Sequence, residues 1–215
     1  MNSIRIYPFL IMFVSSLLFV PFGINHVHAA ASAGTPTPDP LGEKQLSADT
    51  VKIEIRGNNE FVSQTRSAFN MLAQCDLDAF RKVDEFMAKI QEYNRSGMEI
   101  VSDTFLASNT TAFAPGYSRE AQVFWYAGTM VHDAHHNWQS AQGMNTDWGS
   151  LSLEQREELE TEARKVQIDT LQRCLPSIKE SARSEAQAMI DYLVGMQDGT
   201  QECAYCKVEW GDRSW

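Results

Sequence analysis

Beyond residue 60, apolar side chains recur every three or four positions over most of the chain, which is the period of one face of an α-helix. This period predicts five helices, over residues 61–74, 76–93, 119–142, 153–174 and 178–194. The second of them, with Asp76 as its N-cap, has apolar side chains at positions 80, 83, 86, 87, 90 and 93. Asn94 and Gly97 predict its end.

Capping residues support three of these helix starts. Ser118 and Ser152 precede the third and fourth helices, where a serine hydroxyl accepts a hydrogen bond from a free backbone N–H of the first turn. Gln155 follows Ser152 by three residues, so the two predict a capping box. We expect a second capping box from Ser177 and Glu180, which would open the last helix.

Shorter stretches predict strands. Residues 51–55 alternate apolar and polar side chains and then meet the turn residues Gly57 and Asn58. Residues 98–101 and 104–107 are two more candidate strands in a region of irregular period. The expected fold class is therefore mainly α with a small β component.

The N-terminal segment differs in composition from the rest of the chain. Arg5 and the apolar run over residues 9–20 are typical of an export signal, with Ala29 as the favoured cleavage site and residues 31–33 as a competing one. The Gly-, Thr- and Pro-rich segment that follows cannot bury a core. We predict a signal peptide over 1–29, a disordered linker over 30–46 and a single helical domain over 47–215. The protein would be secreted or periplasmic, without stable membrane insertion after signal removal.

The charge pattern argues against a nucleic-acid partner. The formal net charge is −10, and lysines and arginines are scattered singly among acidic residues. Binding to a phosphate backbone needs a basic patch, which the sequence does not contain. The acidity suits an exported protein and leaves the fold and the oligomeric state undetermined.

The four cysteines, Cys75, Cys174, Cys203 and Cys206, form an even set in a chain that is expected to leave the reducing cytoplasm. Disulfides are therefore expected. Three pairings are open, and we favour a local Cys203–Cys206 bond with a long-range Cys75–Cys174 bond. In the alternative interpretation, Cys203 and Cys206 form a redox motif or half of a zinc site.

All three histidines after the predicted signal peptide lie in the middle of the helix over 119–142. His132 and His136 are four residues apart, so they share a helix face and can bind one metal ion. His135 projects in another direction and is expected at the surface or just outside the ligands. A catalytic zinc (Zn²⁺) site needs a third protein ligand. Glu160 of the next helix is the first candidate, and Glu162 is the alternative.

The residues His132, His136, Glu160 and Ala163 resemble the zincin metallopeptidases of the branch in which an HExxH helix is followed by a helix with a Glu-x-x-Ala motif. The resemblance covers about residues 118–171. It implies a zincin-like helical domain with zinc on two adjacent helices and a peptide or protein substrate. It also implies that Asp133, after the first histidine, is the general base for the attacking water.

The chain departs from the family at this base, because the family has glutamate where Asp133 stands. The carboxylate is one methylene shorter, which places peptide hydrolysis in question even if metal binds. The resemblance further implies that a strand near the site, with residues 104–107 as the candidate, presents an edge to an extended peptide.

Two other interpretations fit the same residues. In the first, the histidines hydrogen-bond to neighbours in a helical core, and the chain is a non-enzymatic secreted binding protein with a structural or vestigial metal site. In the second, Cys203 and Cys206 join His132 and His136 in a closed structural zinc site. A carboxylate of Glu160 within ligand distance of a metal held by both imidazoles, with an open cleft above Asp133, would favour the hydrolase, whereas sulfurs converging there would favour the structural site.

Overall fold

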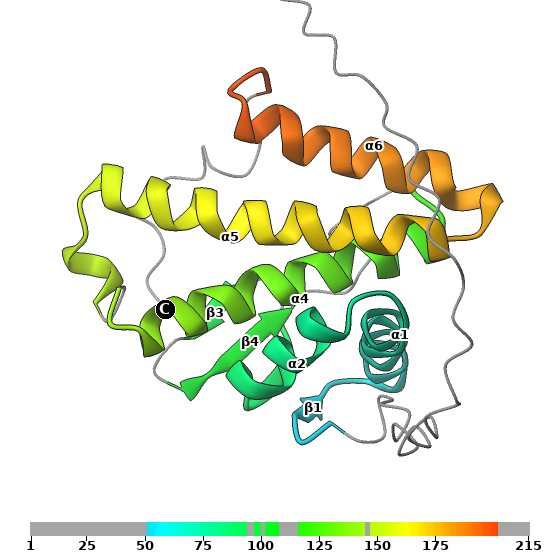
Figure 1. Cartoon of the computed structure of the whole chain (residues 1–215). Helices are drawn as coiled ribbons and strands as arrows, with labels where there is room; N and C mark the ends of the chain where they lie inside the picture. The colour runs from blue at the N-terminus through cyan, green and yellow to red at the C-terminus, as the bar shows by residue number, and fades with distance from the viewer. Residues whose placement is uncertain (1–50, 94–96, 100–101, 108–115, 145–146, 202–215) are drawn as a thin grey trace, which may run out of the picture. The chain divides into compact units, whose positions relative to one another are not determined.

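A long helix, α4 (Arg119–Ala141), lies at the centre of the fold (Figure 1). It contacts the other four α-helices of the described structure, α1 (Asn59–Cys75), α2 (Leu77–Phe86), α5 (Leu153–Cys174) and α6 (Glu180–Gln197). Because α4 is surrounded in this way, side chains on most of its faces are buried, including Tyr126 and Met130. Its polar residues, among them His135 and His136, are therefore also inside the protein.

The computed structural model describes residues 51–93, 97–99, 102–107, 116–144 and 147–201. These residues belong to one compact unit, Lys44–Trp215. The predicted signal peptide and linker lie outside the described residues, as do Cys203 and Cys206. Among the described helices, none combines the length and the apolar character that a membrane span requires.

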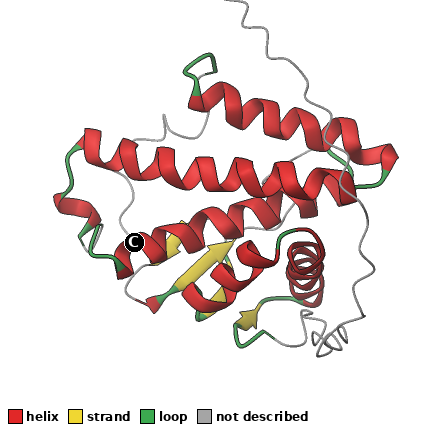
Figure 2. Ribbon diagram, in the orientation of Figure 1, coloured by secondary structure: helices red, strands yellow, loops and turns green. Residues whose placement is uncertain are grey.

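Five α-helices and one four-stranded sheet make up most of the regular structure of the described residues (Figure 2). The predicted fold class, mainly α with a small β component, is confirmed. Ser118 caps α4 through Ala121 N, and Ser152 with Gln155 forms the predicted capping box of α5. These helices begin within a residue of their predicted starts because the capping side chains satisfy N–H groups that have no partner inside the helix.

The sheet runs in the order β1 (Glu54–Arg56), β2 (Lys89–Glu92), β4 (Thr104–Ala107) and β3 (Gly97–Glu99). β1, β2 and β4 pair in parallel, and β3 pairs antiparallel with β4. β4 thus has a neighbour on each side, so the expectation that residues 104–107 present a free edge is wrong. Among the described strands, the edges belong to β1 and β3.

The helix predicted over residues 76–93 ends early. α2 stops at Phe86, Met87 is extended with φ −121° and ψ 121°, and Lys89–Glu92 form β2. Ile90 is fully buried where β2 pairs with β1 and β4. The apolar residues at 87 and 90 fit a helical period, but pairing with strands that are distant in the sequence overrides that local signal.

The predicted capping box of Ser177 and Glu180 is also wrong. Ser177 lies in a short 3-10 helix, Leu175–Ser177, and its hydroxyl donates to the carbonyl of Cys174 at 2.6 Å. α6 begins at Glu180 after Lys179, whose backbone N–H donates to the Glu120 carboxylate at 2.8 Å. A side chain from α4, rather than a local serine, therefore satisfies the amide at this helix start.

The disulfide Cys75–Cys174 joins the C-terminal ends of α1 and α5, across a sequence separation of 99 residues. This confirms the favoured pairing for these two cysteines. The adjacent residues support the same junction, because Arg173 Nε donates to Asp76 Oδ2 at 2.7 Å. The other oxygen of Asp76 caps α2 by accepting from Ala79 N at 3.1 Å. The start of α2 is thus held where α1 and α5 end.

We expect the double variant Cys75→Ser/Cys174→Ser to lower the free energy of unfolding by about 2–5 kcal/mol, because a long loop is released in the unfolded chain. Urea denaturation followed by circular dichroism measures this loss. Cys203→Ser/Cys206→Ser is the matched control, since any bond between two cysteines so close in sequence constrains little of the unfolded chain. Equal losses in the two double variants would contradict the prediction.

Candidate metal centre

The site depends on a close approach between α4 and α5. A Cβ added to Gly128 of α4 would lie 2.8 Å from a side-chain carbon of Leu171, so a larger residue fits only if the Leu171 side chain moves. Ala163 of α5 is fully buried, as expected for a small residue that lets two helices meet. Gly128 lies one helical turn before His132 on the same face of α4. The close Gly128–Leu171 contact is therefore next to the histidines.

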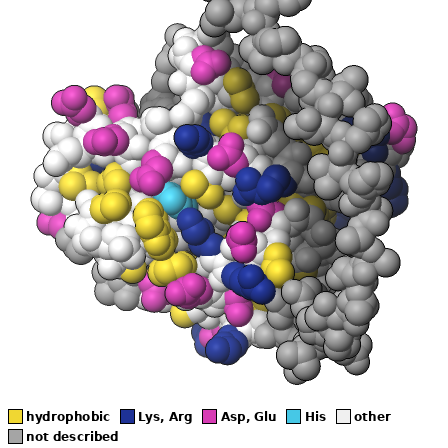
Figure 3. Space-filling model, in the orientation of Figure 1, with side chains coloured by type: hydrophobic (Ala, Val, Ile, Leu, Met, Phe, Trp, Pro, Cys, Tyr) yellow, Lys and Arg dark blue, Asp and Glu magenta, His cyan; other side chains and the backbone are white. Residues whose placement is uncertain are grey.

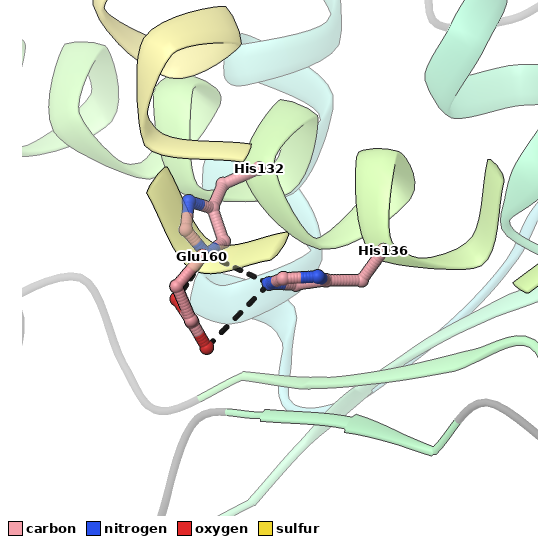
Figure 4. A group of neighbouring side chains, drawn as sticks. All are labelled: His132, His136 and Glu160. Atoms are coloured by element: carbon pink, nitrogen blue, oxygen red, sulfur yellow. Dashed lines mark hydrogen bonds and ion pairs between the residues drawn. The ribbon is translucent and has the colours of Figure 1, made fainter. Parts of the chain in front are cut away.

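Figure 4 shows the three predicted ligands pointing toward one another, His132 and His136 from α4 and Glu160 from α5. The two Nε2 atoms are 3.1 Å apart. Glu160 Oε2 lies 3.3 Å from His132 Nε2, and Glu160 Oε1 lies 3.7 Å from His136 Nε2. The three residues form a group that can hold one metal ion.

The ligand group is partly open to solvent on one side. The side chains of His132 and Glu160 are 17% and 18% exposed, whereas that of His136 is 8% exposed. His136 is thus the most buried of the three ligands.

Charge interactions within the group favour the ionised carboxylate. Burial raises the pKa of Glu160, but hydrogen bonds and charge interactions with His132 and His136 outweigh it and hold that pKa well below its ordinary value. Burial would lower the pKa of His136, yet Glu160 and then Asp133 raise it above the ordinary value. An anionic oxygen therefore faces the two imidazoles, which is the charge arrangement that a cation requires.

Asp133, the predicted base, is buried with 8% of its surface exposed. It is outside the group of three ligands. Burial is the main cause of the raised pKa of Tyr126, and the negative charge of Asp133 raises that pKa further. The same charge contributes to the raised pKa of His136. The charge of Asp133 thus acts both on the ligand His136 and on the buried Tyr126.

The structure selects Glu160 over Glu162 as the third residue of the group. Glu162 instead lies with one oxygen 3.5 Å from His135 Nε2 and the other 3.0 Å from Gln139 Nε2. His135 is 3% exposed, so the expectation of a surface position is wrong and the position just outside the ligands is the observed one. Lys82 Nζ lies 3.0 Å from His135 Nδ1. Burial and then the charge of Lys82 lower the pKa of His135 to about 4.

Two residues beside the site were not predicted. Gln139 is fully buried, and its Oε1 lies 2.9 Å from His136 Nδ1. Trp148, in the 3-10 helix Trp148–Ser150, packs its ring edge-on to His136 with centroids 5.7 Å apart. Gln139 follows His136 by three residues, so helical spacing was a usable signal for it. Trp148 lies in the connection between α4 and α5, where the sequence has no apolar periodicity from which its position could be predicted.

The charged surface agrees with the scattered charges of the sequence. On the face shown in Figure 3, Lys and Arg side chains are interspersed with Asp and Glu side chains over the helices. Comparison of the chain with protein-family models, curated proteins and solved structures gives no match.

We expect Gly128→Val to lower the free energy of unfolding by about 1–3 kcal/mol, because the new side chain overlaps Leu171. Urea unfolding of Gly128→Val, Leu171→Ala and the double variant measures the coupling between the two positions. The valine should cost less when Leu171 is truncated. Equal costs in the two backgrounds would show that the overlap is not the cause.

Proposed function

We propose that the protein is an exported zinc-binding protein with a hydrolase-type site, in which His132, His136 and Glu160 hold Zn²⁺. The observation that carries the proposal is the spacing of the three ligand atoms. Around a tetrahedral zinc ion with bonds of about 2.0–2.1 Å, ligand atoms are separated by about 3.3 Å. The separations here are 3.1, 3.3 and 3.7 Å.

The ligand types favour zinc over harder cations. Calcium and magnesium prefer sites built from oxygen ligands, whereas two imidazoles and a carboxylate suit zinc. Three protein ligands with exposure on one side are typical of a catalytic site, in which a fourth position takes water or substrate. When bound, zinc would supply Lewis acidity, polarising a carbonyl and lowering the pKa of water.

Asp133 is proposed to act as the base in this chemistry, as its position after the first ligand implies. Its charge already acts on His136. The proposed substrate is a peptide or protein, following the resemblance to the zincin metallopeptidases. Because β3 is an edge strand of the described sheet and contacts α4, it replaces β4 as the candidate edge for an extended peptide.

The second candidate is a non-enzymatic exported binding protein with a vestigial or structural metal site. The observation in its favour is that Asp133 lies outside the ligand group and has a shorter side chain than the glutamate of the resembled family. Both candidates place the protein outside the cytoplasm. The disulfide Cys75–Cys174 supports an oxidising compartment for either one.

We expect the purified protein to contain about one zinc ion per chain by elemental analysis, since the three proposed ligand atoms have the spacing of a tetrahedral site. The double variant His132→Ala/His136→Ala and the single variant Glu160→Gln should lose most of it. Glu158→Gln is the matched control, because Glu158 is an acid of the same helix outside the ligand group. A folded protein that stays metal-free after zinc is supplied would contradict the proposal.

If the site is catalytic, we expect weak peptidase activity that Asp133→Glu raises at least about tenfold in kcat/KM, because the longer side chain restores the reach of a base. Asp133→Asn should abolish the activity while retaining zinc. Cleavage of a mixture of quenched fluorescent peptides by the zinc-loaded protein provides the measurement. A zinc-loaded Asp133→Glu protein without activity would favour the binding-protein candidate.

A further inference from the structure

We propose that Gln139 is a positioning residue that decides which ring nitrogen of His136 carries the proton, so that the Nε2 lone pair faces the other ligands. The inference rests on the proposed metal site, because the role that it assigns to Gln139 is to fix the tautomer of His136, one of the proposed ligands. Ligating histidines commonly donate their second N–H to a carbonyl or carboxylate, which fixes the tautomer and the ring orientation. The hydrogen bonds of Gln139 carry the argument.

The orientation of the Gln139 amide is fixed by α5. Its nitrogen lies 3.1 Å from the carbonyl oxygen of Leu159 and 3.0 Å from Glu162 Oε2. Both of these oxygens only accept hydrogen bonds, whereas an amide NH₂ group donates two. A reversed amide would place its own oxygen against two acceptors inside the protein. The amide oxygen of Gln139 must therefore face α4.

On that side, Gln139 Oε1 lies 2.9 Å from His136 Nδ1. Because the amide oxygen only accepts, Nδ1 is the nitrogen that carries the hydrogen. A neutral imidazole carries one hydrogen, so Nε2 is left with a lone pair. Nε2 is also the atom that lies 3.1 Å from His132 Nε2 and 3.7 Å from Glu160 Oε1. The tautomer that Gln139 selects is the one that can bind a metal in this group.

Burial makes this selection strong. Gln139 is 0% exposed and His136 is 6% exposed, so water competes little for either partner. Gln139 also joins the helix of the two histidines to the helix of Glu160, because it lies on α4 and donates to α5. His132 has no such support: its Nδ1 is buried and has no hydrogen-bond partner among the described residues. His136 is therefore the prearranged ligand.

The test combines a spectroscopic measurement with a metal-binding measurement on the full mature chain. Long-range ¹H–¹⁵N NMR of ¹⁵N-histidine-labelled, metal-free protein, recorded at a pH where His136 is neutral, should show the hydrogen on Nδ1. Gln139→Met, which has nearly the same volume but lacks both polar groups, should shift His136 toward the Nε2–H tautomer. Competition with a zinc chelator should show about 10–100-fold weaker zinc binding in this variant.

Two further variants separate positioning from packing. Gln122→Met replaces another buried glutamine of α4, whose Nε2 donates to the carbonyl oxygen of Tyr117, and it should leave both readouts unchanged. Gln139→Glu, made together with Glu162→Gln so that residue 162 can donate to the new carboxylate, keeps an acceptor for Nδ1–H and should keep the wild-type tautomer. A wild-type His136 with its hydrogen on Nε2, or a Gln139→Met protein that retains the Nδ1–H tautomer, would overturn the inference. If the wild-type protein binds no zinc, the proposed function fails, while the NMR result still decides the role of Gln139.

Discussion

The close packing of α4 against α5 is the constraint on which the rest of the structure depends. Residues 128 and 171 meet at one end of this contact, and Gln139 meets Leu159 at the other, so the two helices run antiparallel. Between these contacts, Glu160 reaches His132 and His136. A side chain at 128 would overlap the Leu171 side chain, so glycine lets Leu171 pack directly against α4 beside the charged group.

Local signals predicted the parts of the fold that local interactions determine. The starts of α4 and α5 follow from Ser118 and Ser152, whose hydroxyls bond within the first turn. The histidine pair and Glu160 were also predicted, because helical spacing places residues on a face without any knowledge of the tertiary structure. The choice between Glu160 and Glu162 remained open until the packing of α5 on α4 was known, since a shift of two residues turns a side chain to another face.

The incorrect predictions have a common physical cause, which is contact between residues distant in the sequence. Lys89–Glu92 form a strand because β1 and β4 lie on either side, and the pairing of residues 89–92 with those two strands is not encoded in the local pattern. The start of α6 is satisfied by Glu120 from α4 in place of Ser177. The Cys75–Cys174 pairing was one of several arrangements that the sequence allowed, and the meeting of two helix ends decided it. Each outcome depends on tertiary packing that periodicity does not report.

The ligands, Gln139 and the glycine contact all lie within the hairpin of α4 and α5, residues 119–174. Bringing Glu160 to the histidines therefore closes only a short loop, and the entropy lost in closing a loop grows slowly from a small value at such lengths. The disulfide Cys75–Cys174, by contrast, joins residues that are 99 positions apart. The metal centre is thus more local in sequence than the junction of α1 and α5 at the disulfide, and its ligands can assemble before that junction forms.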